Sequence, residues 1–205
     1  MTNAIITISR EYGSGGKKIG QIVAERLGIP FYDKQLIEET AKEAGLSEDV
    51  VRESEEKLGN GVFYNFVLGA IYGVAYPEKP KMKDLPTAER IFLAQKKIIE
   101  ELAAKGPCVI VGRCADYILK DKKDVLKVFI YADKKEREKR AIEEYNRIPE
   151  YIEQAVSYMD KRRRLHYETY TTQNWGDRTN YHLLLDSGKF GIEGCAEIIC
   201  NGAKK

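Results

Sequence analysis

The stretch IITISREYGSGGKKIGQIVAERL, residues 5–27, decides the fold of this chain. It opens with an apolar run of strand length, residues 5–8, and continues into a turn that contains Gly13, Gly15 and Gly16. Two lysines and an amphipathic helix follow. Glycine lets backbone N–H groups approach an anion closely, and a helix N-terminus adds partial positive charge. The stretch therefore predicts a strand–loop–helix unit that binds phosphate, unless the glycines serve the turn alone.

The loop departs from the standard phosphate-binding pattern G-x-x-x-x-G-K-[ST]. If Gly16 and Lys17 form the G-K pair, Glu11 stands at the first glycine. In that register Lys18 replaces the hydroxyl residue. If Gly15 is instead the last glycine, Gly16 takes the position of the lysine. Both registers lose the hydroxyl that normally ligates Mg²⁺.

Composition narrows the class of protein. The chain has 205 residues, 43% hydrophobic and 32% charged, which suits a single α/β domain over residues 1–205. A net charge of +2 gives no reason to expect nucleic acid as a partner. No apolar run reaches the roughly 18 residues of a membrane span, and Met1 leads into a strand without a basic signal region. Four cysteines without a C-x-x-C pair, beside two histidines, argue against a zinc site. We expect a cytoplasmic protein.

Apolar runs of strand length alternate with helical patterns along the chain. The expected strands are residues 5–8, 30–32, 108–111, 125–131 and 181–185. One helix is expected directly after the glycine loop. Further helices are expected over residues 34–44, 134–172 and 192–199, and another from residue 87 to the Gly-Pro pair at 106–107 that ends it. This alternation predicts a three-layer α/β fold, with a five-stranded parallel sheet and helices on both faces.

Polar side chains gather at the carboxyl ends of three expected strands. They are the loop of residues 10–16, Asp33 after the second strand, and Arg113 with Asp116 after the third. Parallel α/β sheets bind ligands at this edge. The arrangement therefore predicts a nucleotide cleft.

Four segments, taken in order, resemble the cytidylate kinase-like family of P-loop kinases. They are ITISREYGSGGKKIG at residues 6–20, IPFYDKQLI at 29–37, VIVGRCADYIL at 109–119 and WGDRTNYHLLLDSGKFGIEG at 175–194. The family is related to the nucleoside monophosphate kinases, so the resemblance implies a P-loop kinase fold with an acceptor-binding region and a helical lid. It also implies transfer of the γ-phosphoryl group of ATP, with Mg²⁺, to a small acceptor, for which CMP and dCMP are the candidates.

The resemblance also implies which parts of the domain vary. Residues 34–86 would form the acceptor-binding or variable insertion, and residues 134–172 the lid. Within the insertion, residues 59–86 are rich in aromatics and glycine, and could set specificity or oligomeric state or be a plain connection. The arginines of the lid could fold over phosphates, or the segment could be a solvated helical hairpin with i,i+4 ion pairs.

The resemblance assigns individual residues as well. Arg113 matches the arginine of the family's G-R-D-I-G segment, which faces the acceptor. Asp33 follows the second strand, as an aspartate does in cytidylate kinases, and Asp160 with Arg163 could hold the sugar and phosphate of the acceptor. Val111 departs from the family, which carries an aspartate there. The phosphate loop matches Gly13, Ser14, Gly15, Gly16, Lys17 and Lys18.

The kinase hypothesis gives the charged side chains chemical roles. Lys17 is expected to reach the phosphates, with Arg10 as the second candidate. Arg113 would hold the acceptor phosphate with a bidentate fork, and Asp33 or Asp116 would orient the acceptor or position Mg²⁺ through water. From the lid, Arg137, Arg140 or Arg147 could close over the site, and Arg140 joins Lys17 and Arg113 as a predicted catalytic residue. Structural alternatives stay open: solvated lysines, an Arg113–Asp116 pair and a helix cap at Asp33.

Two other classes of function compete with a kinase. A nucleotide-binding regulator that has lost turnover would explain the missing hydroxyl and the displaced lysine. A nucleic-acid-binding module could use the basic run of residues 162–164, but the interspersed acids and the near-neutral net charge argue against it. The expected partner is therefore a small-molecule acceptor. The sequence does not indicate which oligomeric state the protein adopts.

Overall fold

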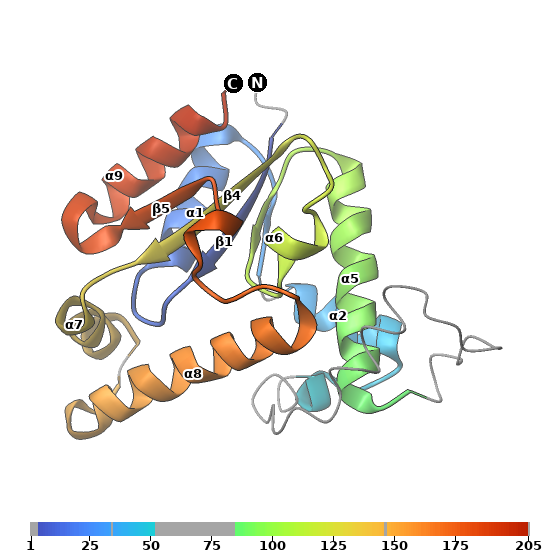
Figure 1. The fold of residues 1–205 in the computed structure, drawn as a ribbon, viewed down its shortest axis with the longest axis horizontal. Helices are drawn as coiled ribbons and strands as arrows, with labels where there is room; N and C mark the ends of the chain where they lie inside the picture. Colours follow the sequence, from blue (N-terminus) through green and yellow to red (C-terminus); the bar gives the residue numbers. More distant parts are fainter. Residues whose placement is uncertain (1–3, 34, 52–84, 146, 205) are drawn as a thin grey trace.

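A five-stranded, fully parallel sheet forms the centre of the protein (Figure 1). The computed structural model describes residues 4–33, 35–51, 85–145 and 147–204. The strand order is β2-β3-β1-β4-β5. The strands are β1 (Ile5–Arg10), β2 (Phe31–Tyr32), β3 (Val109–Val111), β4 (Val125–Tyr131) and β5 (Leu183–Asp186). The predicted parallel sheet is confirmed; the last strand starts two residues later than expected, and Cys108 precedes β3.

β1 is the central strand, and it buries isoleucines toward both faces of the sheet, Ile6 and Ile8 on one and Ile5 on the other. Ile6 pairs with Val109 of β3 on one side, and Ile5 pairs with Val125 of β4 on the other. The first five residues of β1 are buried. A strand covered on both faces reads as a continuous apolar run, which is why the sequence predicted it correctly.

Helices cover both faces of the sheet (Figure 1). On one face, α1 (Gly16–Leu27) and α9 (Ser187–Gly202) pack against Ile6, Ile8 and Ile130. On the other face, α5 (Thr87–Lys105) and α6 (Ala115–Ile118) pack against Ile5 and Ile110. α2 (Gln35–Ala44) contacts α5. The predicted three-layer arrangement is confirmed.

The segment of residues 134–172, predicted as a helical lid or a helical hairpin, forms two helices joined by a turn. They are α7 (Lys134–Tyr145) and α8 (Ile152–Tyr170), with a 3₁₀ turn at Pro149–Tyr151 before α8. Proline cannot donate the backbone hydrogen bond that a continuous helix requires, so the break falls near Pro149. In Figure 1 α8 runs beneath the sheet from α7 toward α5. A short 3₁₀ turn at Arg178–Asn180 leads from this region into β5.

The last helix starts five residues earlier than predicted. Asp186 caps it, because its carboxylate accepts hydrogen bonds from the backbone N–H groups of Gly188 and Lys189. Gly191 has a positive φ of 69°, which kinks the helix. The predicted helix of residues 192–199 is therefore the part of α9 that follows the kink.

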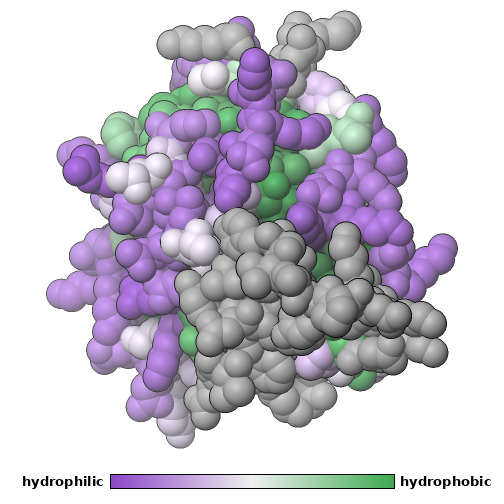
Figure 2. All heavy atoms as spheres, turned by 45° about the vertical axis from the view of Figure 1, so that its right-hand side comes forward, coloured by the Kyte–Doolittle hydropathy of each residue, from purple (hydrophilic) through white to green (hydrophobic). Residues whose placement is uncertain are grey.

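Two further expectations concern the surface. The predicted variable segment of residues 59–86 lies, except for its last two residues, outside the described part of the chain. Among the described residues, no helix combines the length and the apolar character that crossing a bilayer requires. The side of the molecule shown in Figure 2 is mostly hydrophilic over the described residues, with apolar side chains visible between charged ones.

Candidate active site

The glycine loop connects the carboxyl end of β1 to the first turn of α1. Gly13 and Gly15 have positive φ values of 78° and 76°, and Gly15 caps the helix. A Cβ atom on Gly13 would lie 2.4 Å from the carbonyl oxygen of Arg137, so no side chain fits there. The first N–H groups of an α-helix have no partner within the helix, and those of α1 follow directly on this loop. The predicted strand–loop–helix unit thus has the backbone of an anion site.

Side chains from three helices hold the outer side of the loop. Four side chains donate hydrogen bonds to backbone carbonyl oxygens of the loop. In addition, the backbone N–H of Tyr12 donates a hydrogen bond to Asp160 Oδ1 at 2.7 Å. Because the carbonyl oxygens are engaged from outside, the loop is fixed around the helix N-terminus. The four side-chain donors are Arg163 to Arg10 O (3.1 Å), Arg137 to Tyr12 O (3.1 Å), Arg140 to Gly13 O (2.8 Å) and Ser187 to Ser14 O (2.6 Å).

The arginines expected to close a lid therefore contact the protein's own loop. Arg137 is buried and forms ion pairs with Asp160 and, at 3.2 Å, with Glu11. Burial raises the pKa of Glu11, although the Arg137 charge opposes the shift. Arg147 donates to the hydroxyl of Tyr12 at 2.9 Å. In this structure these side chains position the loop from α7 and the turn that follows it.

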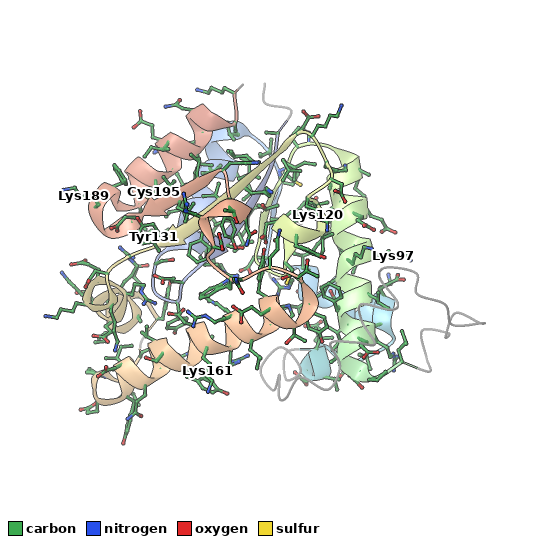
Figure 3. All side chains as sticks on the ribbon, viewed as in Figure 1. Lys97, Lys120, Tyr131, Lys161, Lys189 and Cys195 are labelled. Carbon is green, nitrogen blue, oxygen red and sulfur yellow. The ribbon has the colours of Figure 1, made fainter. Side chains whose placement is uncertain are left out.

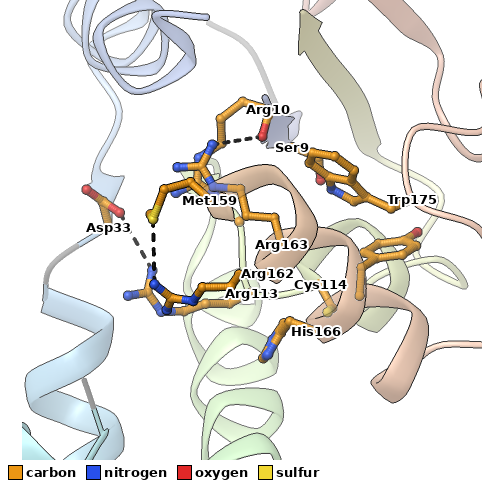
Figure 4. A pocket seen from close by; sticks show the side chains of 12 residues that line it. Ser9, Arg10, Asp33, Arg113, Cys114, Met159, Arg162, Arg163, His166 and Trp175 are labelled. Atoms are coloured by element: carbon orange, nitrogen blue, oxygen red, sulfur yellow. Dashed lines mark hydrogen bonds and ion pairs between the residues drawn. The ribbon is translucent and has the colours of Figure 1, made fainter. Parts of the chain in front are cut away.

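A pocket with a volume of about 190 Å³ lies beside the loop, at the carboxyl ends of β1, β2 and β3 (Figure 4). The nucleotide cleft was predicted at this edge. Four guanidinium groups and an imidazole line it, against one carboxylate, that of Asp33. Such an excess of positive charge favours an anionic ligand. The lining residues are Ser9, Arg10, Asp33, Gly112, Arg113, Cys114, Met159, Arg162, Arg163, His166, Tyr167 and Trp175.

Asp33 is held between two cations. Lys17 Nζ lies 2.8 Å from its Oδ2, and Arg113 Nη1 lies 3.6 Å from its Oδ1. Burial alone would raise the pKa of Asp33, but the hydrogen bond from Lys17 and the charges of Arg10 and Arg113 together lower it. Lys17, expected to reach the phosphates, therefore points toward the Asp33 side of the site in this structure.

Arg113 enters the pocket from a strained backbone. Gly112, Arg113 and Cys114 have successive positive φ values of 77°, 52° and 54°. A left-handed conformation costs a residue other than glycine about 1–2 kcal/mol, and such strain clusters at functional sites. The side chain of Arg113 is 9% exposed. The strained backbone lowers the stability of the folded protein, and it places the guanidinium of Arg113 beside Asp33.

Asp116 lies beneath the pocket. Its carboxylate accepts hydrogen bonds from Ser9 Oγ (3.2 Å) and from the hydroxyl of Tyr167 (2.7 Å), two residues of the lining. Burial raises the pKa of Asp116, and these two hydrogen bonds oppose the shift. Asp116 therefore supports the pocket floor, and the ion pair of Arg113 is formed with Asp33.

The inward face of α8 was only partly found from the sequence. Arg163 was predicted to bind the acceptor, and Arg162 was considered only as part of the basic run of residues 162–164. Met159 and His166 were not assigned to a site. These residues recur at helical spacing and share the side that lines the pocket. Lys161 points away from the sheet (Figure 3), as expected for a residue between two such positions. The three- and four-residue spacing was the signal that could have identified them.

The structure brings only some of the predicted site residues together. Arg10, Asp33, Arg113 and Arg163 meet in the pocket. Arg140 and Asp160 lie outside the lining, where they bind the loop backbone. The nitrogen of Lys18 lies 3.9 Å from Glu144 of α7, and its side chain is largely exposed.

The sheet and the strand–glycine loop–helix unit together define a P-loop kinase fold. A solved shikimate kinase from Acinetobacter baumannii, in complex with shikimate, has a TM-score of 0.51 at 15% identity, covering 96% of this chain and 90% of that one. A shikimate kinase from Bacteroides thetaiotaomicron has a TM-score of 0.54 at 13% identity, covering 97% of each chain. These likenesses concern the fold alone.

The chain belongs to the Cytidylate kinase-like family, which it matches over residues 5–189. It is 29% identical over 200 residues to the cytidylate kinase of Archaeoglobus fulgidus, covering 95% of this chain and 91% of that protein. An uncharacterized protein from Eubacterium ventriosum has a solved structure with a TM-score of 0.74 at 28% identity, covering 98% of each chain. The resemblance seen in the sequence is confirmed, and family and fold together support a phosphotransferase.

Proposed function

We propose that this protein transfers the γ-phosphoryl group of ATP to a small acceptor that carries a phosphate, with CMP or dCMP as the acceptor. One observation carries the proposal: an anion-binding glycine loop and an arginine-lined pocket meet at the end of β1. The relationship to a cytidylate kinase supports the choice of acceptor. In this arrangement the nucleotide phosphates occupy the loop, and the acceptor phosphate occupies the pocket.

To catalyse phosphoryl transfer, the protein has to position the two substrates and neutralise the negative charge on the transferred phosphoryl group. The bond between the γ-phosphorus and the β–γ bridging oxygen breaks, and its electron pair leaves with ADP. A new bond forms from an oxygen of the acceptor phosphate to the same phosphorus. That oxygen is mostly deprotonated at neutral pH, because the second pKa of a phosphate monoester is about 6. No side chain therefore has to remove a proton.

The arginines of the pocket would hold the acceptor. Arg113 and Arg163 have planar forks that match two phosphate oxygens; the Arg113 side chain is 9% exposed and Arg163 is partly buried. Arg162 adds positive charge from α8, and His166 adds an imidazole from the same helix. Asp33 fixes Lys17 and Arg113 in place, so its part is to orient the groups that contact the acceptor.

Mg²⁺ fits this site as a companion of the nucleotide. Among the described residues, no group of three histidine, cysteine or acidic side chains could hold a metal ion. Mg²⁺ in kinases is bound through phosphate oxygens and water with few protein ligands, and it neutralises charge that develops on the phosphates. The oxygen donors that the pocket could offer it are Ser9, Asp33 and Tyr167.

The test is release of ADP from ATP and Mg²⁺ in the presence of CMP, dCMP, UMP, AMP or GMP, with a control without acceptor. We expect release that depends on CMP or dCMP. An Arg113→Ala variant should raise the KM for the acceptor by tenfold or more, while Lys161→Ala, on the outer face of α8, should match the wild type. Binding of ATP without turnover on any acceptor would instead indicate a nucleotide-binding regulator.

A further inference from the structure

The structure shows how the glycine loop fits the pattern G-x-x-x-x-G-K-[ST]. The last glycine of the pattern stands where the loop turns into the helix. Gly15 occupies that place, because it has a left-handed φ and caps α1, whereas Gly16 is the first ordinary helical residue. Counting back from Gly15 puts Arg10 at the first glycine of the pattern and Gly16 at the lysine. Glycine and cation have therefore exchanged positions.

The side chain of Arg10 fills the space that this exchange leaves. A Cβ atom on Gly16 would lie 2.7 Å from Cβ and 3.1 Å from Cγ of Arg10. A Cβ atom on Gly112 would lie 2.2 Å from Nη1 of Arg10. Arg10 therefore crosses over the first residue of α1 and ends above Gly112, where it lines the pocket (Figure 4). Gly16 needs no unusual φ, so its missing side chain serves to make this room.

Lys17 does not take over the place of the missing lysine. Its nitrogen lies 2.8 Å from Asp33, which follows β2, a strand separated from β1 by β3. Arg10 instead starts at the end of the strand that leads into the loop, and its guanidinium is close enough to Asp33 to act on that carboxylate electrostatically. Arg10 thus stands between the glycine loop and the acceptor pocket, where a transferred group would pass.

We propose that Arg10 is the catalytic cation of this kinase, and replaces the lysine of the standard loop by reaching the transferred phosphoryl group from the strand side. The proposal rests on the proposed function. An arginine is suited to this position because its planar guanidinium stays charged and can contact oxygens of two phosphates at once. In this proposal the loop differs from the standard pattern in the position of its cation but keeps the positive charge, which Arg10 supplies in place of the lysine.

The decisive experiment restores the standard pattern. Arg10→Gly should lower kcat about 10²–10³-fold, the usual effect of removing one transition-state donor. Gly16→Lys alone should also be poorly active, because Arg10 blocks the new side chain. The double variant R10G/G16K should regain at least tenfold over R10G. Arg10→Lys keeps the charge but loses the planar fork, so its kcat should lie between those of the wild type and R10G. The Tm of each variant controls for folding.

Two results would overturn the proposal: an R10G variant with kcat within threefold of the wild type, or a folded double variant no better than R10G. Lys17→Ala provides the contrast, since it should raise the KM for the acceptor more than it lowers kcat. Wild-type turnover tests the proposed function separately. If the wild type shows none, ATP affinity measured by calorimetry carries the same comparison: R10G should weaken it tenfold or more, and R10G/G16K should restore it.

Discussion

Replacing Asp160 by alanine would remove the acid that joins α8 to the glycine loop. One oxygen of Asp160 accepts the N–H of Tyr12 at 2.7 Å, and the other pairs with the buried guanidinium of Arg137. The Asp160 side chain is 16% exposed, so solvent replaces little of what is lost. After the substitution, Arg137 would keep its ion pair with Glu11 at 3.2 Å.

The expected loss of stability follows from these contacts. Removing one partner of a buried ion pair costs about 3–5 kcal/mol. Because Glu11 still compensates part of the Arg137 charge, we expect about 2–3 kcal/mol for Asp160→Ala. Asp160→Asn keeps an oxygen for the N–H of Tyr12 but loses the charge, and should cost about 1–2 kcal/mol. For a protein of this size, the alanine variant should lower Tm by about 4–12 °C.

Thermal and urea unfolding of the two Asp160 variants measure this directly. Glu153→Ala is the matched control, because Glu153 forms an ion pair with Lys134 at the exposed end of the same helix. Its Tm should equal that of the wild type. An Asp160→Ala variant that also unfolds with the wild type would refute the argument that this acid holds the loop.

Three further predictions concern single residues. Gly13→Ala should lower the free energy of unfolding by more than about 2 kcal/mol, because the new Cβ meets Arg137 O. Gly28→Ala, with a similar φ but nothing within 4 Å, should cost about 1–2 kcal/mol in the same urea titration; equal losses would contradict this. Tyr167→Phe should cost about 1–3 kcal/mol, since it leaves a buried carboxylate without one donor, and an unchanged Tm would argue against that bond. The pKa of Asp33 is lowered on folding from 3.8, so its ion pairs stabilise the protein fully above that pH and are lost as pH falls below it. The Tm difference between the wild type and Asp33→Asn should thus be constant from about pH 5 to 7 and shrink as the pH falls below 3.8; a difference that does not shrink in acid would contradict this assignment.

Much of the fold follows from local patterns. The five strands are short, mostly apolar runs that alternate with helical patterns, and this alternation predicts a parallel sheet with crossover helices, although not the strand order β2-β3-β1-β4-β5. The same rule brought Asp33 and Arg113 to one edge, so their meeting was predictable before any distance was known. The break at Pro149 could also have been predicted, because proline interrupts a helix of this length.

The contacts of the arginines could not be predicted in the same way. Arg137 and Arg140 bind backbone atoms of Tyr12 and Gly13, which are more than 120 residues away in the sequence. A helix that carries many charged residues gives no indication of which of them will be buried. The direction of the Arg10 side chain could not be predicted either, because it depends on the space that the absent side chains of Gly16 and Gly112 leave in the folded protein.

The hydrogen bonds around the glycine loop also affect the order in which parts of the protein fold during synthesis. The loop lies near the start of the chain, yet its shape depends on Asp160, Arg163 and Ser187, which are 148, 153 and 173 residues away from their partners. Contacts between such distant residues form late in folding, and a chain emerging from the ribosome meets them last. The capacity to bind nucleotide should therefore appear only when α9 has docked. If the protein binds ATP as proposed, affinity for ATP would then report whether α9 of a newly made molecule has docked.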